Sequence, residues 1–254
     1  IGDMGDVLLL PFTGEAKEKP IATFLKTDEK AEVGYYAVKF NNYDVKSELA
    51  STNRVGRNRF TFSGQEAKQV LVDIGHILQR TWGHENVYNE LEVIDNKSLK
   101  GLKHSSGWAF DHKVFYHIEF SSPFTIDKTV VDSLEVKSSK LYKGQNIHSY
   151  LKFNELDENE PLLVKVSISS VDTDGAKKNM MQELAGWDFD KVAKESQIEW
   201  RKLLQKIKVD SKDEEKLRIF YTGMYHSLIA PMTAQDVDGR YRGMDLKIHQ
   251  GSDS

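Results

Sequence analysis

Residues 34–62 read GYYAVKFNNYDVKSELASTNRVGRNRFTF, and this stretch decides the fold. In its first part, aromatic and β-branched side chains alternate with a period of two, which is typical of a β-strand. Asn41-Asn42 interrupts this run and a second one starts at Tyr43, so we predict a tight antiparallel hairpin. Arg57–Phe62 forms a third predicted strand. Three adjacent strands with one apolar face need a second layer to cover that face.

The strand pattern continues through the N-terminal two thirds of the chain. Further strands are predicted at Val7–Leu10, Ala22–Leu25, Gln69–Ile74, Val87–Ile94, Asp132–Val136, Ser149–Phe153 and Leu162–Ile168, and twice within Ser98–Phe120. So many short strands, with frequent turn signals and few helical patterns, indicate a mainly β chain. We therefore predict a large antiparallel β-sandwich domain over residues 1–172.

From Ser170 on, the hydrophobic period lengthens toward that of an α-helix. Three helices are predicted: one capped by Asp174 and running to Leu184, one capped by Asp188 and running to Ile207, and one that starts after Ser211 and is closed by Pro231. The third carries a wide apolar stripe, which either the sandwich or a part of the protein beyond this chain must cover. We assign these linking helices to a second region, residues 173–254.

Composition excludes several classes of protein. The chain has 254 residues, 39% of them hydrophobic, and a formal charge of −4, so it offers no basic field for a nucleic acid partner. No apolar stretch is long enough to span a membrane. Cysteine is absent, which excludes a disulfide framework and a thiolate metal site. The first residues resemble no signal peptide and lack an initiator Met, so we expect a piece of a longer protein.

Two places carry candidate binding residues, each with a purely structural alternative. Trp108 follows Gly107 at a turn between strands, where an exposed indole would stack on a sugar and a buried one would belong to the core. Near the C-terminus, Asp238-Gly239 suits a tight turn better than a calcium loop, because no closing Glu follows at the required spacing. Arg240 and Arg242 would share one strand face and grip hydroxyls or carboxylates, or form structural salt bridges. These alternatives stay open.

Known catalytic motifs are absent from the sequence. The eight His residues have no HExxH-like spacing, and no nucleophile elbow, phosphate loop or dinucleotide fingerprint occurs. Any of the 39 acidic residues could serve a glycosidase, because spacing in one sequence cannot identify a catalytic pair. Motifs alone therefore leave the function open.

Five blocks of sequence together resemble glycoside hydrolase family 92. In family order they are GDMGDVLLLPFTG, GYYAVKF with ELASTNRVGRNRFTF, SGWAFDHKVFYHIEFSSPF, LLVKVSISSVDTDGAKKNM with GWDFDKV, and IFYTGMYHSLIAPMTAQDVDGRYRGMD. The blocks span nearly the whole chain. The resemblance implies an N-terminal β-sandwich, linking helices and the start of an α/α six-barrel catalytic domain, which would begin within residues 173–254.

The resemblance also implies a function. Family members are exo-acting, calcium-dependent, inverting α-mannosidases, often α-1,2-specific, which act on high-mannose N-glycans or mannan and are exported to the periplasm, cell surface or medium. The family's catalytic acid, base and calcium ligands lie downstream of the last block, so we expect no catalytic or metal residue in this chain and no activity from it alone. Its remaining roles would be to pack against the missing catalytic domain and to line the sugar pocket with Trp108, Asp238, Arg240 and Arg242.

Two other functions stay possible at this point. A self-standing carbohydrate-binding module would use aromatic residues on one sheet face, but it would have no partner to bury the apolar stripes of the C-terminal helices. A structural interaction domain without affinity for sugar would bind no mannose at all. Calorimetric titration with mannobiose would separate the binding module from the other two.

Overall fold

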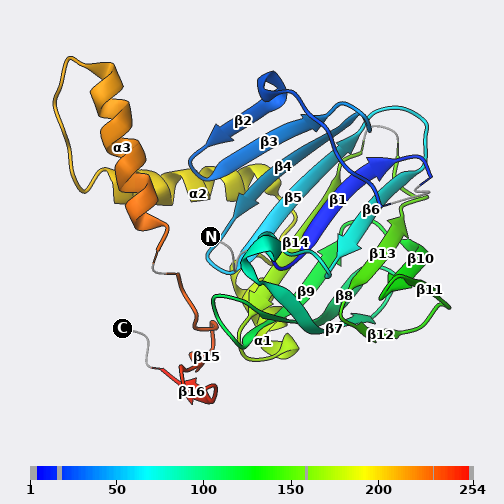
Figure 1. Ribbon diagram of the computed structural model, residues 1–254. Helices are drawn as coiled ribbons and strands as arrows, with labels where there is room; N and C mark the ends of the chain where they lie inside the picture. The colour runs from blue at the N-terminus through cyan, green and yellow to red at the C-terminus, as the bar shows by residue number, and fades with distance from the viewer. Residues whose placement is uncertain (1–4, 16–18, 158–159, 231, 252–254) are drawn as a thin grey trace.

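Figure 1 shows the computed structural model, which describes residues 5–15, 19–157, 160–230 and 232–251. The strands are β1 (Leu8–Thr13), β2 (Glu29–Glu32), β3 (Tyr35–Phe40), β4 (Val45–Ser51), β5 (Val55–Phe62), β6 (Lys68–Asp73), β7 (Glu85–Val93), β8 (Ser98–Ser106), β9 (His112–Phe120), β10 (Thr125–Val131), β11 (Leu134–Val136), β12 (Leu141–Gly144), β13 (Ile147–Lys152), β14 (Leu162–Ser169), β15 (Arg240–Arg242) and β16 (Ile248–Gln250). The helices are α1 (Thr173–Glu183), α2 (Phe189–Leu204) and α3 (Glu214–Leu228). Strands dominate the first two thirds, and helices follow.

Two antiparallel sheets form the predicted sandwich. One has the strand order β1-β6-β13-β10-β11 and the other the order β12-β7-β8-β9-β14-β5-β4-β3-β2. The decisive stretch is confirmed: β3, β4 and β5 are neighbours in the larger sheet, with Tyr36 opposite Leu49 and Ser47 opposite Phe60. The turn before β4 differs in detail, because Asp44, at φ 47°, takes the left-handed conformation there.

The core lies between the two sheets. From β5 in the larger sheet, Phe60 and Phe62 point into it, and they meet Val70 and Val72 of β6 in the smaller sheet. All four are buried, and β6 is buried on both faces as its apolar run predicts. Burial of aromatic and branched side chains on facing sheets is the main source of stability in such a sandwich.

One buried ion pair ties the smaller sheet to the N-terminal segment. The Asp73 carboxylate, at the end of β6, has no exposed surface and lies 2.5 Å from Lys19 Nζ and 3.2 Å from His148 Nε2. Burial acts to raise the pKa of the Asp73 carboxyl, but these two partners outweigh it and lower the pKa to about 2.

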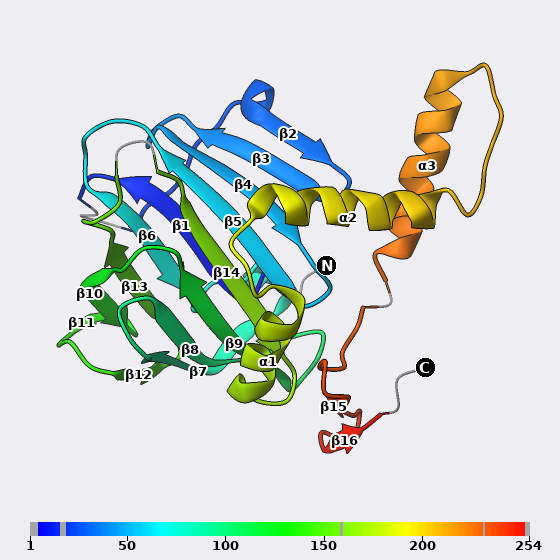
Figure 2. The ribbon, with the colours of Figure 1, turned by 180° about the vertical axis from the view of Figure 1, so that it is seen from behind.

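The helices cover only part of the outer face of the larger sheet. In Figure 2, α1 lies against β14 and β9, and α2 crosses β4 and β5. Buried residues of both helices, among them Met180 and Phe189, pack with Val55 of β5. By contrast, α3 projects away from the sandwich and has no buried residue in the described chain. It contacts α2, where the Trp200 and Tyr225 rings lie 4.8 Å apart.

Trp187, in the turn between α1 and α2, contacts two cations of the larger sheet, Arg57 on β5 and Lys165 on β14. The Arg57 guanidinium lies 5.0 Å from the ring centre and Lys165 Nζ lies 4.2 Å from it. Arg57 is fully buried; its Nη2 donates to the Gly186 carbonyl, while Nε and Nη1 have no hydrogen-bond partner among the described residues. Lys165 donates to Ala185 O at 3.1 Å. The ring therefore compensates buried charge and fixes the turn that leads into α2.

Two local predictions were wrong. Residues 22–25 form no strand, because the Asn42 side chain binds Thr23 N and Ile21 O and so occupies the backbone groups that a strand would pair. The cap of α1 is Asp172, whose Oδ1 accepts from Gly175 N at 2.6 Å, and Asp174 lies inside the helix. The predicted cap of α2, Asp188, is confirmed. The third helix begins after Ser211 as predicted, and Asp213 is its cap.

Other predictions are left untested. Pro231, predicted to close α3, lies outside the described residues. The predicted boundary between residues 172 and 173 falls where α1 begins, but the division into two domains stays a prediction, as does the six-barrel. Within the described residues, no helix has the length and apolar character needed to cross a bilayer.

Candidate functional site

A pocket of about 500 Å³ opens where the sandwich meets the C-terminal segment. Three parts of the chain line it: the loop between β8 and β9 with the first residues of β9 (108–114), the end of β14 with Ser170, and residues 233–236 with 242–246. Asn53 and Arg54, just before β5, complete the lining. A pocket of this size, built from segments far apart in sequence, is a typical small-molecule site.

The loop between β8 and β9 supplies exposed aromatic rings. Trp108 is 90% exposed and Phe110 is 77% exposed, and both line the pocket. The Trp108 indole is therefore not part of the sandwich core, and its contact with a sugar stays a prediction. Gly107 is required at the start of the loop, since a Cβ there would lie 2.6 Å from the His84 ring. The loop therefore presents two aromatic rings where sugar rings could stack.

Charged side chains hold the end of this loop. Asp111, which lines the pocket, lies 2.6 Å from His104 Nε2 and 2.9 Å from Lys113 Nζ. The hydrogen bond from Lys113 is the main cause of the lowered pKa of the Asp111 carboxyl. Next to it, His112 Nε2 lies 3.3 Å from the Asp6 carboxylate. The aromatic loop is thus anchored to the strands on both sides by ion pairs.

Arg242 also lines the pocket. Its Nε donates to Ser170 O at 3.0 Å and its Nη1 donates to Leu246 O at 3.0 Å. Both acceptors are backbone carbonyls, and among the described residues no hydrogen bond is formed by Nη2, whose N–H groups could donate to a ligand hydroxyl. The structure brings Arg242 and Trp108 to one pocket.

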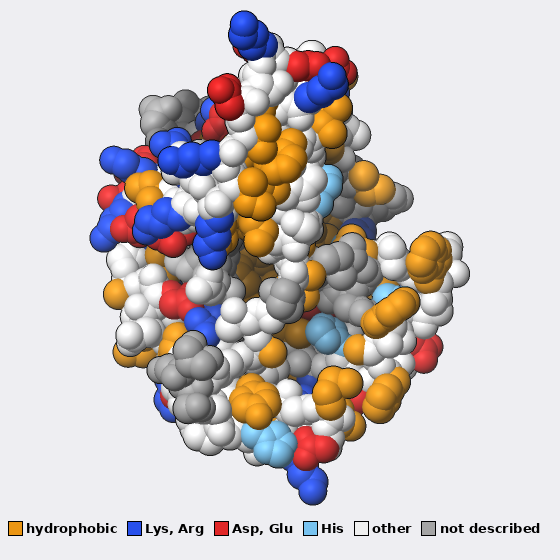
Figure 3. Space-filling view, turned by 90° about the vertical axis from the view of Figure 1, so that its left-hand side faces the viewer, with side chains coloured by type: hydrophobic (Ala, Val, Ile, Leu, Met, Phe, Trp, Pro, Cys, Tyr) orange, Lys and Arg blue, Asp and Glu red, His pale blue; other side chains and the backbone are white. Residues whose placement is uncertain are grey.

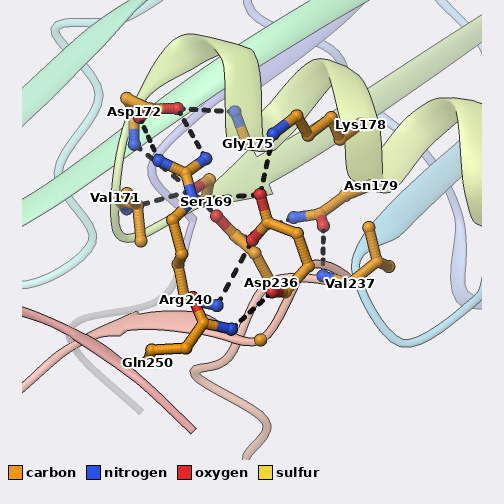
Figure 4. A network of polar contacts seen from close by, with 12 residues as sticks. Ser169, Val171, Asp172, Gly175, Lys178, Asn179, Asp236, Val237, Arg240 and Gln250 are labelled. Atoms are coloured by element: carbon orange, nitrogen blue, oxygen red, sulfur yellow. Dashed lines mark hydrogen bonds and ion pairs between the residues drawn. The ribbon is translucent and has the colours of Figure 1, made fainter.

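Asp238 and Arg240 lie outside the pocket lining, in a structural network (Figure 4). Arg240 Nη1 donates to Asp172 Oδ2 at 2.6 Å and its Nε donates to Asp238 Oδ2 at 2.9 Å, while Lys178 Nζ binds Asp238 at 2.9 Å. The salt-bridge alternative therefore describes Arg240 better than direct sugar binding. Burial acts to raise the pKa of Asp238, but the hydrogen bonds from Lys178 and Arg240 lower it to about 2.

Asp236 and Asn179 form the buried centre of this network. The Asp236 carboxylate accepts from Ser169 Oγ at 2.6 Å and from Asn179 Nδ2 at 2.8 Å. Asn179 also donates to Ile168 O at 2.9 Å and accepts from Val237 N at 2.9 Å. We call Ser169, Asp172, Asn179, Asp236 and Arg240 the anchor network. It binds the C-terminal segment to α1 and β14, and so holds one wall of the pocket in place.

The C-terminal segment folds differently from the predicted hairpin. Asp238-Gly239 does form a tight turn, in which Gly239 N donates to Asp236 O at 2.9 Å and Gly239 has a φ of +83°. The paired strands β15 and β16, however, are joined through residues 243–247. The reason is that Val237 N is already bound to Asn179, so residues before the turn contact α1 in place of a second strand.

Sequence reasoning did not single out Arg54. This side chain lines the pocket, donates from Nε to Gln235 O at 2.6 Å and from Nη1 to Glu183 Oε1 at 2.6 Å, and so connects the sandwich, α1 and the C-terminal segment. Its signal was its place in the block ELASTNRVGRNRFTF, between two predicted strands. Its partners lie about 130 and 180 residues away and follow no local pattern.

The described residues contain no group of three or more His, Cys, Asp or Glu side chains placed to hold a metal ion. The acidic residues beside the pocket are engaged otherwise: Asp172 and Asp238 pair with Arg240, and Asp236 is bound by Ser169 and Asn179. These carboxylates therefore do not fit a calcium ligand set, which needs six to eight oxygens around the ion.

Comparisons with solved structures show the fold in known enzymes. The GH92 α-mannosidase BT3965 from Bacteroides thetaiotaomicron is 30% identical, with a TM-score of 0.89, over 98% of this chain and 35% of that chain. Its complex with mannoimidazole gives 31% identity and the same TM-score, over 98% of this chain and 34% of that one. The GH92 inverting mannosidase BT2199 from the same organism, at 23% identity and a TM-score of 0.85, shares the fold over 96% of this chain and 33% of that one.

Sequence comparisons agree with the structural ones. An uncharacterized secreted glycosidase from Arthroderma benhamiae is 26% identical over 249 residues, which are 88% of this chain and 31% of that protein. The chain thus spans about a third of the length of these relatives. Residues 1–169 match the Glycosyl hydrolase family 92 N-terminal domain, and residues 175–254 match the Glycosyl hydrolase family 92 catalytic domain. The chain therefore belongs to glycosyl hydrolase family 92.

Proposed function

We propose that the full-length protein is an exo-acting, inverting α-mannosidase and that this chain supplies one side of its mannoside pocket. The observation that carries the proposal is the match to an α-mannosidase at 30% identity and a TM-score of 0.89 over 98% of the chain. The match of residues 175–254 to the catalytic domain supports a hydrolase over a self-standing carbohydrate-binding module.

In this proposal, the residues of this chain bind and orient the sugar. Trp108 and Phe110 stack on the apolar faces of hexose rings, and Arg242, from another part of the pocket lining, donates to hydroxyl groups. Asp238 and Arg240 do not contact the sugar. They act indirectly, because the anchor network fixes the segment that carries Arg242. Orientation of this kind lowers the activation barrier when the reacting groups are held in line.

The chemical groups of the reaction are proposed to lie outside this chain. Inversion needs one carboxylic acid that protonates the leaving oxygen and one carboxylate that activates water on the other face of the sugar. We place both, and the calcium ligands, in the remainder of the protein; the bound calcium would contact sugar hydroxyls. On this basis the chain alone is inactive.

The remainder of the protein is also the proposed partner of α3. Figure 3 views the molecule from the side on which α3 projects, and hydrophobic side chains gather along its upper half. Ile219 and Leu228 of α3 are exposed. Apolar side chains exposed on a projecting helix are often buried against other protein, and we propose that the rest of the catalytic domain covers α3.

Substrate and location follow the same reasoning. We propose α-1,2-linked mannose at the ends of high-mannose N-glycans or mannan as the substrate. Export to the periplasm, the cell surface or the medium is supported by the secreted relative from Arthroderma benhamiae.

The proposal is tested by incubating the full-length protein with α-1,2-, α-1,3- and α-1,6-mannobiose, with and without a calcium chelator. Proton NMR during the first minutes identifies the anomer released. We expect mannose release, fastest from the α-1,2 substrate, with β-mannose formed first and activity lost on chelation. Release of α-mannose first would contradict inversion, and no release from any linkage would contradict the proposed activity.

A further inference from the structure

A second exposed tryptophan lies close to the pocket but does not line it. Trp82 is 75% exposed and ends the short 3-10 turn Arg80–Trp82, directly before β7. Its indole has no hydrogen bond or ring contact within the described part of the chain. Tryptophan is enriched at binding surfaces, because its ring offers a large apolar face and a polar N–H.

Strand pairing places Trp82 beside the aromatic loop of the pocket. Glu85, the first residue of β7, pairs with Ser106, the last residue of β8. The residues before β7 and those after β8 therefore leave the larger sheet at the same end of these two strands. The contact between Gly107 and the His84 ring, where a Cβ would lie 2.6 Å away, confirms that the two loops touch.

The turn that carries Trp82 is held in place despite its exposure. Arg80 Nη2 donates to Gly75 O at 2.9 Å, and Asn86 Nδ2 donates to the same carbonyl at 2.9 Å. Gly83 ends the turn in the left-handed conformation, at φ +80°. A fixed backbone under an exposed ring lowers the entropy lost on binding, which is the usual arrangement in a preformed binding surface.

The surroundings of Trp82 favour a sugar over a protein or a lipid. The residues directly beside it, in the sequence RTWGH, are polar, charged or lack a side chain, while Leu78, four positions earlier, is a separate exposed apolar residue. Isolated flat rings separated by polar groups suit hexoses, each of which offers one apolar face and a rim of hydroxyls. A protein interface would instead need a continuous apolar patch at its centre, and a lipid surface a basic face.

We propose that Trp82 is a second aromatic platform, which binds a hexose of an oligomannoside chain outside the pocket. The inference rests on the proposed function, since the chain reaches Trp82 from a mannose held at Trp108. The enzyme would then prefer substrates longer than a disaccharide, because a disaccharide ends before the second platform.

The test compares mannobiose with mannotetraose of the same linkage, using the full-length protein. For Trp82→Ala, the ratio of kcat/KM on mannotetraose to that on mannobiose is expected to fall about fivefold, as expected when one aromatic contact is lost. The change should appear as a higher KM for mannotetraose, with kcat unchanged. Trp82→Phe should restore most of the ratio, and Leu134→Ala, an exposed apolar residue on β11, should leave it unchanged.

Two results would overturn the inference. One is an unchanged ratio in Trp82→Ala. The other is an equal loss on both substrates with a lower melting temperature, which would show that the indole packs against the rest of the protein. If the wild type releases no mannose, the proposed function fails separately. Calorimetric titration of mannotetraose into wild type and Trp82→Ala then still tests the platform, with weaker binding by the variant expected and equal binding contradicting it.

Discussion

Asn179→Ala should release the C-terminal segment from α1. The Asn179 side chain is fully buried and makes three hydrogen bonds, to Ile168 O, Asp236 Oδ1 and Val237 N, at 2.8–2.9 Å. A lost bond to a buried carboxylate costs about 1.5–3 kcal/mol, and each unpaired backbone group costs about 1 kcal/mol or more. Alanine itself favours a helix, so the net loss is about 3 kcal/mol.

Hydrogen exchange with mass spectrometry measures this loss locally in the full-length protein. A loss of about 3 kcal/mol corresponds to a roughly 100-fold fall in the protection of residues 235–250. Lys178→Ala is the matched control, because Lys178 is the neighbouring residue on α1 and makes an exposed ion pair with Asp238. It should cost less than about 1 kcal/mol.

The comparison of the two variants decides whether the buried hydrogen bonds hold the pocket wall. If Asn179→Ala left the protection of residues 235–250 unchanged, the anchor network would not hold the segment. If Lys178→Ala reduced it as much as Asn179→Ala, the stabilisation would come from surface charge, and the argument from buried hydrogen bonds would be wrong.

Three further predictions concern stability, each measured by urea unfolding of the full-length protein. The pKa of Asp73 is lowered to about 2, which adds roughly 2 kcal/mol to the free energy of unfolding above pH 4. This contribution is lost as the pH falls toward 2, and Asp73→Asn should abolish this pH dependence. Gly239→Ala should destabilise the C-terminal segment, because the φ of Gly239 is +83° and an added Cβ would clash with the Gln250 side chain. Trp187→Leu should lower the free energy of unfolding by about 1–2 kcal/mol, since Arg57 and Lys165 lose their contacts with the aromatic ring. These predictions would be contradicted if Asp73→Asn kept the loss of stability at low pH, or if Gly239→Ala and Trp187→Leu were as stable as the wild type.

Local patterns were sufficient to predict most of the sandwich. Period two in residues 34–62 yields β3, β4 and β5, because alternation places one face of each strand in the core. The cap Asp188 was found because a cap side chain bonds to a residue only three positions away. The same reasoning failed at Asp174, where Asp172 takes the role, and at residues 22–25, where the Asn42 side chain competes with strand pairing.

The pocket could be predicted only in part, because long-range contacts decide it. Trp108 and Arg242 were singled out for their chemistry, and the fold brings them together although they are 134 positions apart. Arg240 was expected in the same place, but its side chain turns to Asp172, which no local rule indicates. Arg54 was missed because its partners are far away in the sequence.

The kinetics of Trp108→Ala in the full-length protein show whether this chain contacts the substrate. If Trp108 stacks on the sugar, kcat/KM for release of mannose from mannobiose should be at least about fivefold lower in Trp108→Ala than in the wild type. The core should be undisturbed, because the indole is exposed. A variant that folds and turns over mannobiose at the wild-type rate would show that this face of the chain does not contact the substrate.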